Sequence, residues 1–566
     1  MTKSIYDELS DERKELQQLG KLPPWFTTAS WQLLKQKYTT EEHPDFYSIV
    51  KRVSGCAAEH MGKDKELYAK KFFSLIWNGW LAMSTPVIAN MGTTRGCPVS
   101  CSGNYVEDSV YDFYDSQKET AVLTKNGFGT SSYLGGIRGR GEPIKSGGTA
   151  SGVLPVLRDY VQLSRDVSQG NTRRGAWAGY LEIEHKDFWE VASHLINNPD
   201  DCNIGWLVTH SFIESLEQGD EEAVKRYQRA MKVKMVTGKG YFVFIDKINE
   251  QNPDMYAEHG LSVKASNLCT EITLHSDEFH TFTCVLSSMN LAKYDEWKDT
   301  DAVQTAIIFL DCVAEEFIRV GKGIKGLEKA VRFTERGRAL GLGTLGFHTY
   351  LQQNMVALDS MDAYQLNQQI FKGIKDEAVK ASKWLAQVKG EPKWCKGYGV
   401  RNTHLLAIAP NSSSALICGG VSQGIEPVYE NAYLQASPAG EINRINPALL
   451  QCMKLRGIYS NELVTKIIKN NGSIQELEEF TEDEKEVFKT AFEWSQEWLI
   501  RLASARQRFI CQAQSLNLFF PENAPEEWIS QVHKTAFKDK YIKSLYYLRS
   551  KAGVKASTGE CVACEG

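Results

Sequence analysis

The sequence predicts an α/β protein in which helices precede a mainly parallel, barrel-like domain. The 566-residue chain is too long for one ordinary domain, although a large α/β barrel with additions holds most of it. Hydrophobic residues make up 42% and charged residues 24%, the balance of a globular protein with a large core. After about residue 84, short apolar runs alternate with helical stretches, which is typical of a parallel sheet with crossover helices.

The first 83 residues predict a helical N-terminal domain. Leu33, Leu34 and the stretch 68–80 place apolar residues three and four apart, as on one face of a helix. Ser84-Thr85-Pro86 ends this pattern, because proline cannot continue a helix. We therefore expect a helical domain over residues 1–83 and the barrel over residues 84–548.

Within the barrel region, glycine-rich loops separate the apolar runs. Residues 240–245 are rich in aromatic and β-branched side chains, as buried strands are. Amphipathic helices are expected at about 302–320, 361–389 and 480–505. The remaining residues, 549–566, are polar and rich in Gly, Ser and Lys, so they predict a flexible tail.

Composition argues against several classes of function. The net charge of −5 gives no global attraction to nucleic acid or to an anionic membrane. No apolar run reaches the ~18 residues that span a bilayer, and the N-terminus lacks a signal-peptide core, so we expect a cytoplasmic protein. Thirteen cysteines without an export signal indicate inert core residues or working thiols, not a disulfide framework.

The stretch 266–272 carries the most unusual pattern. If it is extended, Asn267, Cys269 and Glu271 point to one side, so an amide, a thiol and a carboxylate share a face. Taken alone, this alternation is also what chance produces around a buried cysteine. The residues therefore leave both interpretations open.

Four other cysteines stand near small or flexible segments. Cys561 and Cys564 lie close together in the tail, where a dithiol that cycles to a disulfide fits better than an incomplete zinc site. Cys101 and Cys284 each follow a short apolar or small-residue segment. Sequence alone does not show that these two meet, and an inert core role is equally open for each.

Several segments carry groups that suit phosphate. Pro410-Asn411-Ser412-Ser413-Ser414 precedes an apolar run, so it predicts a helix N-terminus with hydroxyls and free backbone N–H groups. Thr85 could add another hydroxyl. Loops around Arg138 and Arg173 combine glycine with arginine, although no Walker or Rossmann pattern is present. Tyr546 and Tyr547 are adjacent aromatic residues just before the tail.

Taken together, these motifs resemble the large catalytic subunit of class I ribonucleotide reductase. The ordered set extends from about residue 84 to the end of the chain. In chain order the motifs are Ser84-Thr85-Pro86, Cys101, Asp108-Ser109, Ile137-Arg138, Ser168-Gln169-Gly170, Thr237-Gly238, Asn267 to Glu271, Cys284 to Ser287, Asn290-Leu291, Arg401-Asn402-Thr403, Pro410 to Ser414, Gly424 to Pro427, Tyr546-Tyr547 and the cysteine tail.

The resemblance implies a ten-stranded α/β barrel with a central finger loop, and it implies a role for each catalytic residue. Cys269 would form the thiyl radical, Glu271 would act as the base and Asn267 would hold the substrate hydroxyls. Cys101 and Cys284 would supply two electrons as a dithiol. The remaining redox residues would be the relay pair Tyr546 and Tyr547 and the tail pair Cys561 and Cys564, which thioredoxin or glutaredoxin would reduce.

The resemblance also implies ligands and partners. The residues expected to hold the substrate are Thr85, Ser100, Asn411, Ser412, Ser413 and Ser414. The residues expected at the effector site for ATP, dATP, dTTP or dGTP are Asp108, Ser109, Arg138 and Arg173, with the loop from about 170 to 176 between effector and substrate. No cofactor or metal is expected to bind tightly to this chain, because a metal-containing small subunit would supply the radical. A homodimer is expected.

The sequence departs from the family pattern at two points. The helical domain starts almost at once, so we expect no N-terminal ATP cone and no dATP shut-off through one. Gly96 to Cys101 holds two cysteines, and the spacing to Thr85 and Asp108 favours Cys101 over Cys97 as the redox thiol.

Three alternative functions follow from the same residues. An adenosylcobalamin-dependent reductase would share the barrel and the cysteines, but the paired tyrosines argue against it. The glycyl-radical class fits less well, since the tail offers a dithiol where that class carries its glycine. A catalytically silent nucleotide-binding protein with ordinary core cysteines is the third alternative.

Overall fold

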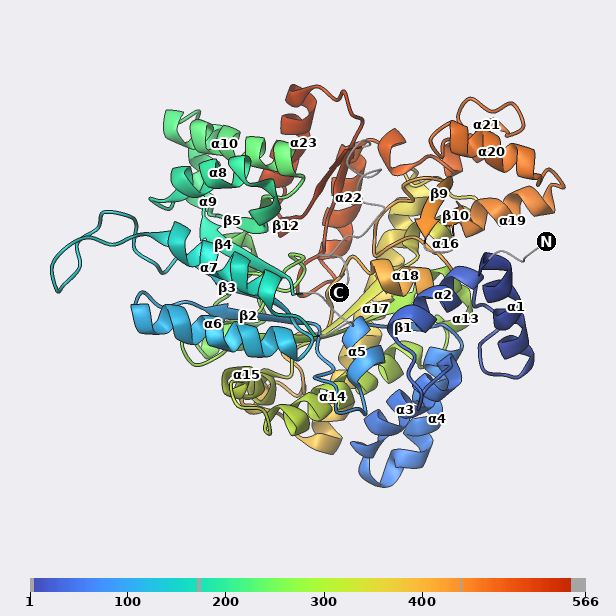
Figure 1. Cartoon of the computed structure of the whole chain (residues 1–566), viewed down its shortest axis with the longest axis horizontal. Coiled ribbons are helices and arrows are strands. Elements are labelled where there is room, and N and C mark those ends of the chain that lie inside the picture. Colours follow the sequence, from blue (N-terminus) through green and yellow to red (C-terminus); the bar gives the residue numbers. More distant parts are fainter. Residues whose placement is uncertain (1–4, 170–174, 438–439, 551–566) are drawn as a thin grey trace.

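A computed structural model describes residues 5–169, 175–437 and 440–550 of the chain. Its centre is a curled sheet enclosed by helices (Figure 1). α3 (Phe46–Glu59) and α4 (Lys65–Trp77) lie beside α14 (Ala302–Gly321), while α8 (Phe188–Asn197) and α10 (Glu221–Thr237) lie on the opposite side of the view (Figure 1).

The N-terminal segment forms four main helices: α1 (Ile5–Gln18), α2 (Thr28–Lys37), α3 (Phe46–Glu59) and α4 (Lys65–Trp77). α2 and α3 both begin with capping boxes, in which the Thr27 and Asp45 side chains accept backbone N–H groups three residues on. β1 (Leu81–Met83) follows. Pro86 then lies in the first turn of α5 (Thr85–Asn90), where a missing N–H is harmless. The helical pattern is interrupted as predicted, but the same proline starts a new helix.

Five parallel strands form the first half of the barrel. They are β2 (Cys101–Tyr105), β3 (Gly129–Tyr133), β4 (Trp177–Glu182), β5 (Ile204–Val208) and β6 (Tyr241–Phe244). The connecting helices are α6 (Val110–Lys125), α7 (Val153–Asp166), α8 (Phe188–Asn197), α9 (His210–Glu217) and α10 (Glu221–Thr237). Parallel neighbours require such crossovers, so the alternating pattern in the sequence is explained.

The second half runs antiparallel to the first where the two meet. β7 (Phe282–Asn290) pairs with β2, and β8 (Leu340–Leu345) continues parallel to β7. Bridges Leu342–Leu406 and Ile408–Gln514 add two extended segments, and β12 (Ser544–Leu545) pairs antiparallel with β6. The Tyr546 N–H donates to the Leu516 carbonyl, which joins β12 to the preceding segment. Among the described residues these five segments and β2–β6 make the ten predicted strands.

Most predicted helices have the expected bounds, with one exception. α14 covers Ala302–Gly321 and α17 covers Met361–Lys389, as predicted. The helix predicted at about 480–505 is wrong, because that stretch divides into α21 (Glu482–Val487), a short turn at Ala491–Glu493 and α22 (Gln496–Gln507). A capping box formed by Thr490 and Glu493 starts the middle turn, so local side-chain bonds override the helical periodicity.

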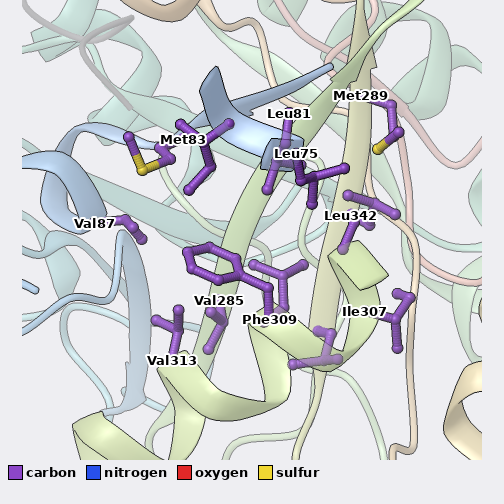
Figure 2. Close-up of a cluster of buried hydrophobic side chains, with 14 of the residues drawn as sticks. Leu75, Leu81, Met83, Val87, Val285, Met289, Ile307, Phe309, Val313 and Leu342 are labelled. Carbon is purple, nitrogen blue, oxygen red and sulfur yellow. The ribbon is translucent and has the colours of Figure 1, made fainter. Parts of the chain in front are cut away.

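The N-terminal helices and the barrel share one hydrophobic core. Figure 2 shows Leu75 of α4 and Leu81 of β1 among side chains of β7, β8 and α14. Phe309 of α14 is fully buried in this cluster. Each such side chain contributes about 1.5–3 kcal/mol on burial. The helical segment is therefore held to the barrel by a common core.

The remaining elements cover the barrel ends and form a small satellite. The hairpin β9 (Ala432–Ser437) and β10 (Gly440–Ile445) is followed by α19 (Pro447–Leu455) and α20 (Asn461–Lys469). These helices pack around their own apolar cluster with Phe488. The other elements used below are α11 (Ile245–Glu250), α15 (Glu328–Gly337), α18 (Ser412–Ile417), β11 (Leu518–Phe520), α23 (Glu526–Lys538) and β13 (Leu548–Ser550).

Candidate active site

A loop between α12 (Asp254–Glu258) and β7 passes through the barrel interior. Its base is closed by an antiparallel bridge between Val263 and His275. Residues 266–272 are all buried, yet they form a turn and not a strand. Thr270 has φ of 69°, a left-handed conformation that a β-branched residue rarely adopts. The stretch is therefore a loop tip inside the barrel, as the resemblance implies.

The barrel wall satisfies the backbone of this loop. Ser515 Oγ donates to the Cys269 carbonyl at 2.6 Å, and Ser544 Oγ donates to the Thr270 carbonyl at 3.0 Å. Ser131 Oγ donates to the Ser266 carbonyl at 2.7 Å. Tyr180 OH also donates to the loop, at the Asn267 carbonyl. Buried carbonyls are costly when unpaired, so these bonds fix the loop in its strained turn.

The turn joins two of the three predicted side chains, Asn267 and Glu271, by a hydrogen bond, although not by strand alternation, while the Cys269 thiol contacts Tyr546. Asn267 Nδ2 donates to Glu271 Oε1 at 2.9 Å and to Cys101 Sγ at 3.2 Å. Ser515 Oγ also donates to Glu271 Oε2 at 3.0 Å, so one hydroxyl contacts both the Cys269 backbone and the Glu271 carboxyl. The amide, the carboxyl and a thiol are thus adjacent.

Glu271 is poised to exchange a proton near neutral pH. Burial raises the pKa of its carboxyl to about 7, and bonds from its own backbone, Asn267 and Ser515 partly oppose that rise. A carboxyl with this pKa can serve as a base or an acid at physiological pH. Its environment therefore suits proton transfer.

Cys101 and Cys284 are direct neighbours across the antiparallel pair β2–β7. They are register partners, and both are free thiols in this structure. Opposed residues in such a pair have Cα atoms about 4.5–5.5 Å apart, within the range that a disulfide spans. Burial raises the pKa of the Cys284 thiol, while Gln512 Nε2 donates to its sulfur at 3.5 Å. The structure therefore brings together the pair that sequence could not join.

Cys97 lies elsewhere. It is fully buried in the apolar core next to the N-terminal helices, and burial raises the pKa of its thiol to about 12. Its carbonyl accepts from Asn90 Nδ2 at 2.8 Å. Of the two nearby cysteines, only Cys101 is aligned with Cys284.

Tyr546 and Tyr547 lead directly to Cys269. Their ring centroids are 4.1 Å apart, and Tyr546 OH donates to Cys269 Sγ at 3.3 Å. Tyr241 of β6 joins them, at 4.7 Å from the Tyr546 ring and 5.6 Å from the Tyr547 ring. Sequence analysis treated Tyr241 only as part of a strand. The signal that could have found it is the strand period, which places Tyr241 and Val243 on one side of β6.

Five of the six predicted substrate residues lie at two helix starts close to β1, and the sixth, Ser100, directly precedes β2. Thr85 Oγ1 at the start of α5 shares a hydrogen bond of 2.9 Å with Tyr38 OH. Ser414 Oγ in α18 donates to the Met83 carbonyl at 3.0 Å, which joins α18 to the β1–α5 junction. Asn411 caps α18 with φ of 61°. Ser412 and Ser413 are half-buried, and Ser100 is buried beside Cys101.

Three of the four predicted effector residues are described. Arg138 donates to the Asp108 carboxylate through its side chain and its backbone N–H. Ser109 caps α6 by accepting the Asp112 N–H at 3.1 Å. Arg173 lies outside the described residues, as do the tail cysteines Cys561 and Cys564 and the centre of the loop from 170 to 176.

A group of His275, Asp277 and His280 has the residue types of a metal site. Asp277 accepts from both imidazoles, at 2.9 Å and 2.8 Å. Burial acts to raise the pKa of Asp277, but the bonds from His275 and His280 outweigh it and hold that pKa well below its usual range. Arg336 Nη1 lies 2.6 Å from His280 Nε2. Its guanidinium already places a positive charge beside the group, and this charge would repel a metal cation. The group therefore forms a hydrogen-bonded clasp at the base of the loop.

Along the described ranges, none of the helices combines the length and apolar character that a bilayer crossing needs.

Comparisons with known proteins agree with the site. The family described as "Ribonucleotide reductase, barrel domain" matches residues 99–229, 222–398 and 393–548. The solved structure of an Actinobacillus ureae class Id ribonucleotide reductase alpha subunit is 38% identical, with a TM-score of 0.86 over 93% of this chain and 97% of that chain. This similarity favours the class I interpretation over the adenosylcobalamin-dependent alternative.

Curated relatives extend the match along the chain. The ribonucleoside-diphosphate reductase large subunit of Invertebrate iridescent virus 3 is 31% identical, over 93% of this chain and 94% of that protein. A Frog virus 3 (isolate Goorha) protein, provisionally named a ribonucleoside-diphosphate reductase large subunit, is 34% identical over 90% of this chain and 95% of its own length. The predicted family and enzyme type are confirmed, and the chain belongs to the ribonucleotide reductase family, among the large subunits of class I.

Proposed function

We propose that this chain reduces ribonucleoside diphosphates to 2′-deoxyribonucleoside diphosphates by a radical reaction centred on Cys269. The observation that carries the proposal is the bonded arrangement inside the barrel. Cys269 is contacted by a tyrosine hydroxyl, and Asn267 two residues earlier bridges the Glu271 carboxyl and the Cys101 thiol. An oxidising partner, a base and a reductant are therefore gathered at one loop.

The radical reaches Cys269 through the tyrosine pair. An oxidant in a separate metal-containing small subunit removes one electron and one proton from Tyr547. Tyr547 then takes a hydrogen atom from Tyr546, and Tyr546 takes one from the Cys269 thiol, which leaves a thiyl radical. Ring contact at 4.1 Å and the 3.3 Å hydroxyl–sulfur hydrogen bond support these two transfers.

Reduction then uses the dithiol. The thiyl radical removes the 3′ hydrogen atom, and Glu271 accepts the 3′ hydroxyl proton. The 2′ hydroxyl leaves as water with a proton from one thiol of the Cys101–Cys284 pair, and C2′ takes the hydrogen of the other thiol. The two thiols thereby supply two electrons and become a disulfide, and Glu271 returns its proton to the 3′ oxygen. Cys269 returns its hydrogen atom to C3′. The strand register of Cys101 and Cys284 supports this step.

Turnover needs the disulfide to be reduced again. Cys561 and Cys564 are proposed to do so by thiol–disulfide exchange, and thioredoxin or glutaredoxin would then reduce this tail pair. Buried thiols such as Cys284 cannot meet a large reductase directly, so a peptide arm that enters the barrel fits the burial of the site.

Substrate and effector positions are proposed for two sets of residues. Thr85, Ser100 and residues 411–414 are proposed to hold the substrate diphosphate. Asp108, Ser109, Arg138 and Arg173 are proposed to bind a nucleoside triphosphate effector, with allosteric coupling through the loop at 170–176.

A homodimer is proposed through α6, beside the effector residues. Val110, Tyr111 and Tyr114 are 71%, 76% and 61% exposed at the start of this helix. Three neighbouring apolar or aromatic side chains in water indicate a surface that a partner covers.

The test of the proposal is Cys269→Ser. The variant loses the thiol hydrogen atom that forms the radical, so deoxynucleotide formation should fall below detection while nucleotide binding persists. The assay uses the full chain with candidate small subunits loaded with iron or manganese. Deoxynucleotide formation by the variant would disprove the radical role. Activity with added adenosylcobalamin and no second subunit would reverse the choice of class.

A further inference from the structure

A buried lysine contacts the backbone of the tyrosine that touches Cys269. Lys234, in the last turn of α10, is fully buried. Its Nζ donates to the Tyr546 carbonyl, and to the Gly240 carbonyl at 3.3 Å. Lys234 thus contacts the backbone of Tyr546, while the side-chain hydroxyl of the same tyrosine donates to Cys269 Sγ. One residue thus links the end of α10 to the tyrosine beside the candidate radical site.

The environment of Lys234 is unusual for a cation. Its hydrogen-bond acceptors among the described residues are the two carbonyls, and the Phe242 ring lies 5.6 Å from its Nζ. The titratable groups that face it are Cys202, from the turn before β5, and His533 of α23. Burial raises the pKa of Cys202 and lowers that of His533 to about 3, so both are neutral near pH 7.

Burying an ammonium group costs free energy of folding, so a lysine at this position suggests that its charge has a function. Burial lowers the pKa of Lys234 to about 7, so the ammonium is only partly retained at neutral pH. An apolar side chain would fill the same space without this desolvation cost. A charge-assisted hydrogen bond is stronger than a neutral one, and it fixes the carbonyl that it contacts.

We propose that Lys234 is a positioning residue for the radical relay, which holds Tyr546 at hydrogen-bond distance from Cys269. This inference rests on the proposed function of Tyr546. Hydrogen-atom transfer depends on short contact between the phenol and the thiol, and a small displacement of a reacting group can lower a rate about 100-fold. The bond from Lys234 limits such displacement at the backbone of Tyr546.

A matched control exists in the same part of the fold. Lys247 of α11 is also buried, and its Nζ donates to the carbonyls of Phe537 and Asp539, each at 2.7 Å. Burial lowers its pKa to about 8. Lys247 is therefore buried like Lys234 and also donates to backbone carbonyls, but none of these carbonyls belongs to Tyr546.

The experiment compares Lys234→Met with Lys247→Met in the full chain, assayed with its small subunit. For Lys234→Met we expect kcat to fall about 10-fold or more with KM unchanged. Hydrogen exchange at residues 540–550 should become faster. Lys247→Met should keep kcat, and both variants should lose thermal stability to a similar extent. Equal losses of kcat in the two variants, or a normal kcat in Lys234→Met, would overturn the proposal.

Lys234→Arg provides a second measurement if the methionine variant does not fold. Arginine keeps the charge and the donor at every accessible pH. In the wild type, kcat should decrease as pH rises through about 7, because the ammonium is lost there. Lys234→Arg should keep activity and lose this decrease, and an unchanged decrease would count against Lys234. Tyr546→Phe tests the relay separately from the role of Lys234. Activity in that variant would refute the relay itself.

Discussion

At the scale of single residues, the site depends on one carboxyl whose environment changes its chemistry. Glu271 is buried at 1% exposure with an amide and a hydroxyl as its side-chain partners. Neither partner is charged, so burial dominates and the pKa rises to about 7. The carboxyl is protonated in much of the resting population and ionised above neutral pH.

The first residue-scale prediction concerns activity. Since the base form is the carboxylate, ionisation of Glu271 should raise kcat/KM on the acid side of about pH 7, while loss of the Lys234 ammonium should lower it on the alkaline side. Glu271→Gln should remove this rise and leave less than about 1% of the activity, the usual scale of a general-base contribution. The measurement is kcat/KM from pH 5.5 to 8.5, and an unchanged profile in the variant would contradict the role.

The same pKa has a consequence for folding. The folded state binds the Glu271 proton more tightly than the unfolded state, so this group stabilises the fold at low pH. That contribution is lost as pH rises from about 4.5 to about 7. A shift of this size corresponds to about 3 kcal/mol. Glu271→Gln should therefore gain stability relative to the wild type between pH 5 and pH 8, as denaturant unfolding would show. A constant difference across that range would refute the shift.

At the scale of elements, strand register decides which thiols can meet. β2 and β7 bring Cys101 opposite Cys284, whereas Cys97 lies four residues earlier in an apolar core. A disulfide between Cys101 and Cys284 therefore needs little movement of the strands.

The element-scale prediction is a loss of two thiols in one turnover. With substrate and no external reductant, a chain in which Cys561 and Cys564 are both replaced by serine should show two fewer thiols, and peptide mapping should place the new disulfide at Cys101 and Cys284, because the tail can no longer take it over by exchange. The variant Cys284→Ser should show no loss, while Cys97→Ala should behave as the wild type. A disulfide that maps to Cys97 would contradict the pairing.

The family can be recognised from the sequence because the motifs stand in the family's order, not because any one motif is distinctive. The strand period predicts one shared face for Asn267, Cys269 and Glu271, but the loop turns at Thr270, so Asn267 bonds to Glu271 while the Cys269 thiol contacts Tyr546. Pairing of Cys101 with Cys284 and the approach of Tyr241 to the tyrosine pair depend on contacts between distant segments. The order of residues within one segment does not predict such contacts between segments far apart in the chain. The split helix at 480–505 was missed because a cap at Thr490 competes with periodicity.

At the scale of the whole molecule, the proposed dimer surface at the exposed start of α6 directly follows two of the proposed effector residues in the chain. Tyr111 is 76% exposed, and it lies two residues after the effector candidate Ser109. A partner that covers Tyr111 would also enclose the effector residues, so effector binding and association should be linked.

The whole-molecule prediction is that Tyr111→Glu weakens the homodimer. A charge at the centre of a buried interface is left unpaired, which strongly opposes association. Light scattering should show a dimer for the wild type and a shift towards the monomer for the variant. Tyr459→Glu is the control, because Tyr459 is also exposed, at 42%, but lies far along the chain before α20. Equal masses for Tyr111→Glu and the wild type would exclude this surface.

The closed ring of strands has one further consequence. The two parallel halves of the barrel meet at two antiparallel strand pairs, β2–β7 and β6–β12. Each half contributes five strands between these two seams. The thiol pair occupies one seam, and Tyr546 directly follows β12 at the other. The tyrosine proposed to carry the radical and the dithiol proposed to be the reductant therefore lie at different seams. Tyr546 contacts the Cys269 thiol directly at 3.3 Å, so the proposed hydrogen-atom transfer to Tyr546 needs no contact between Tyr546 and the Cys101–Cys284 pair.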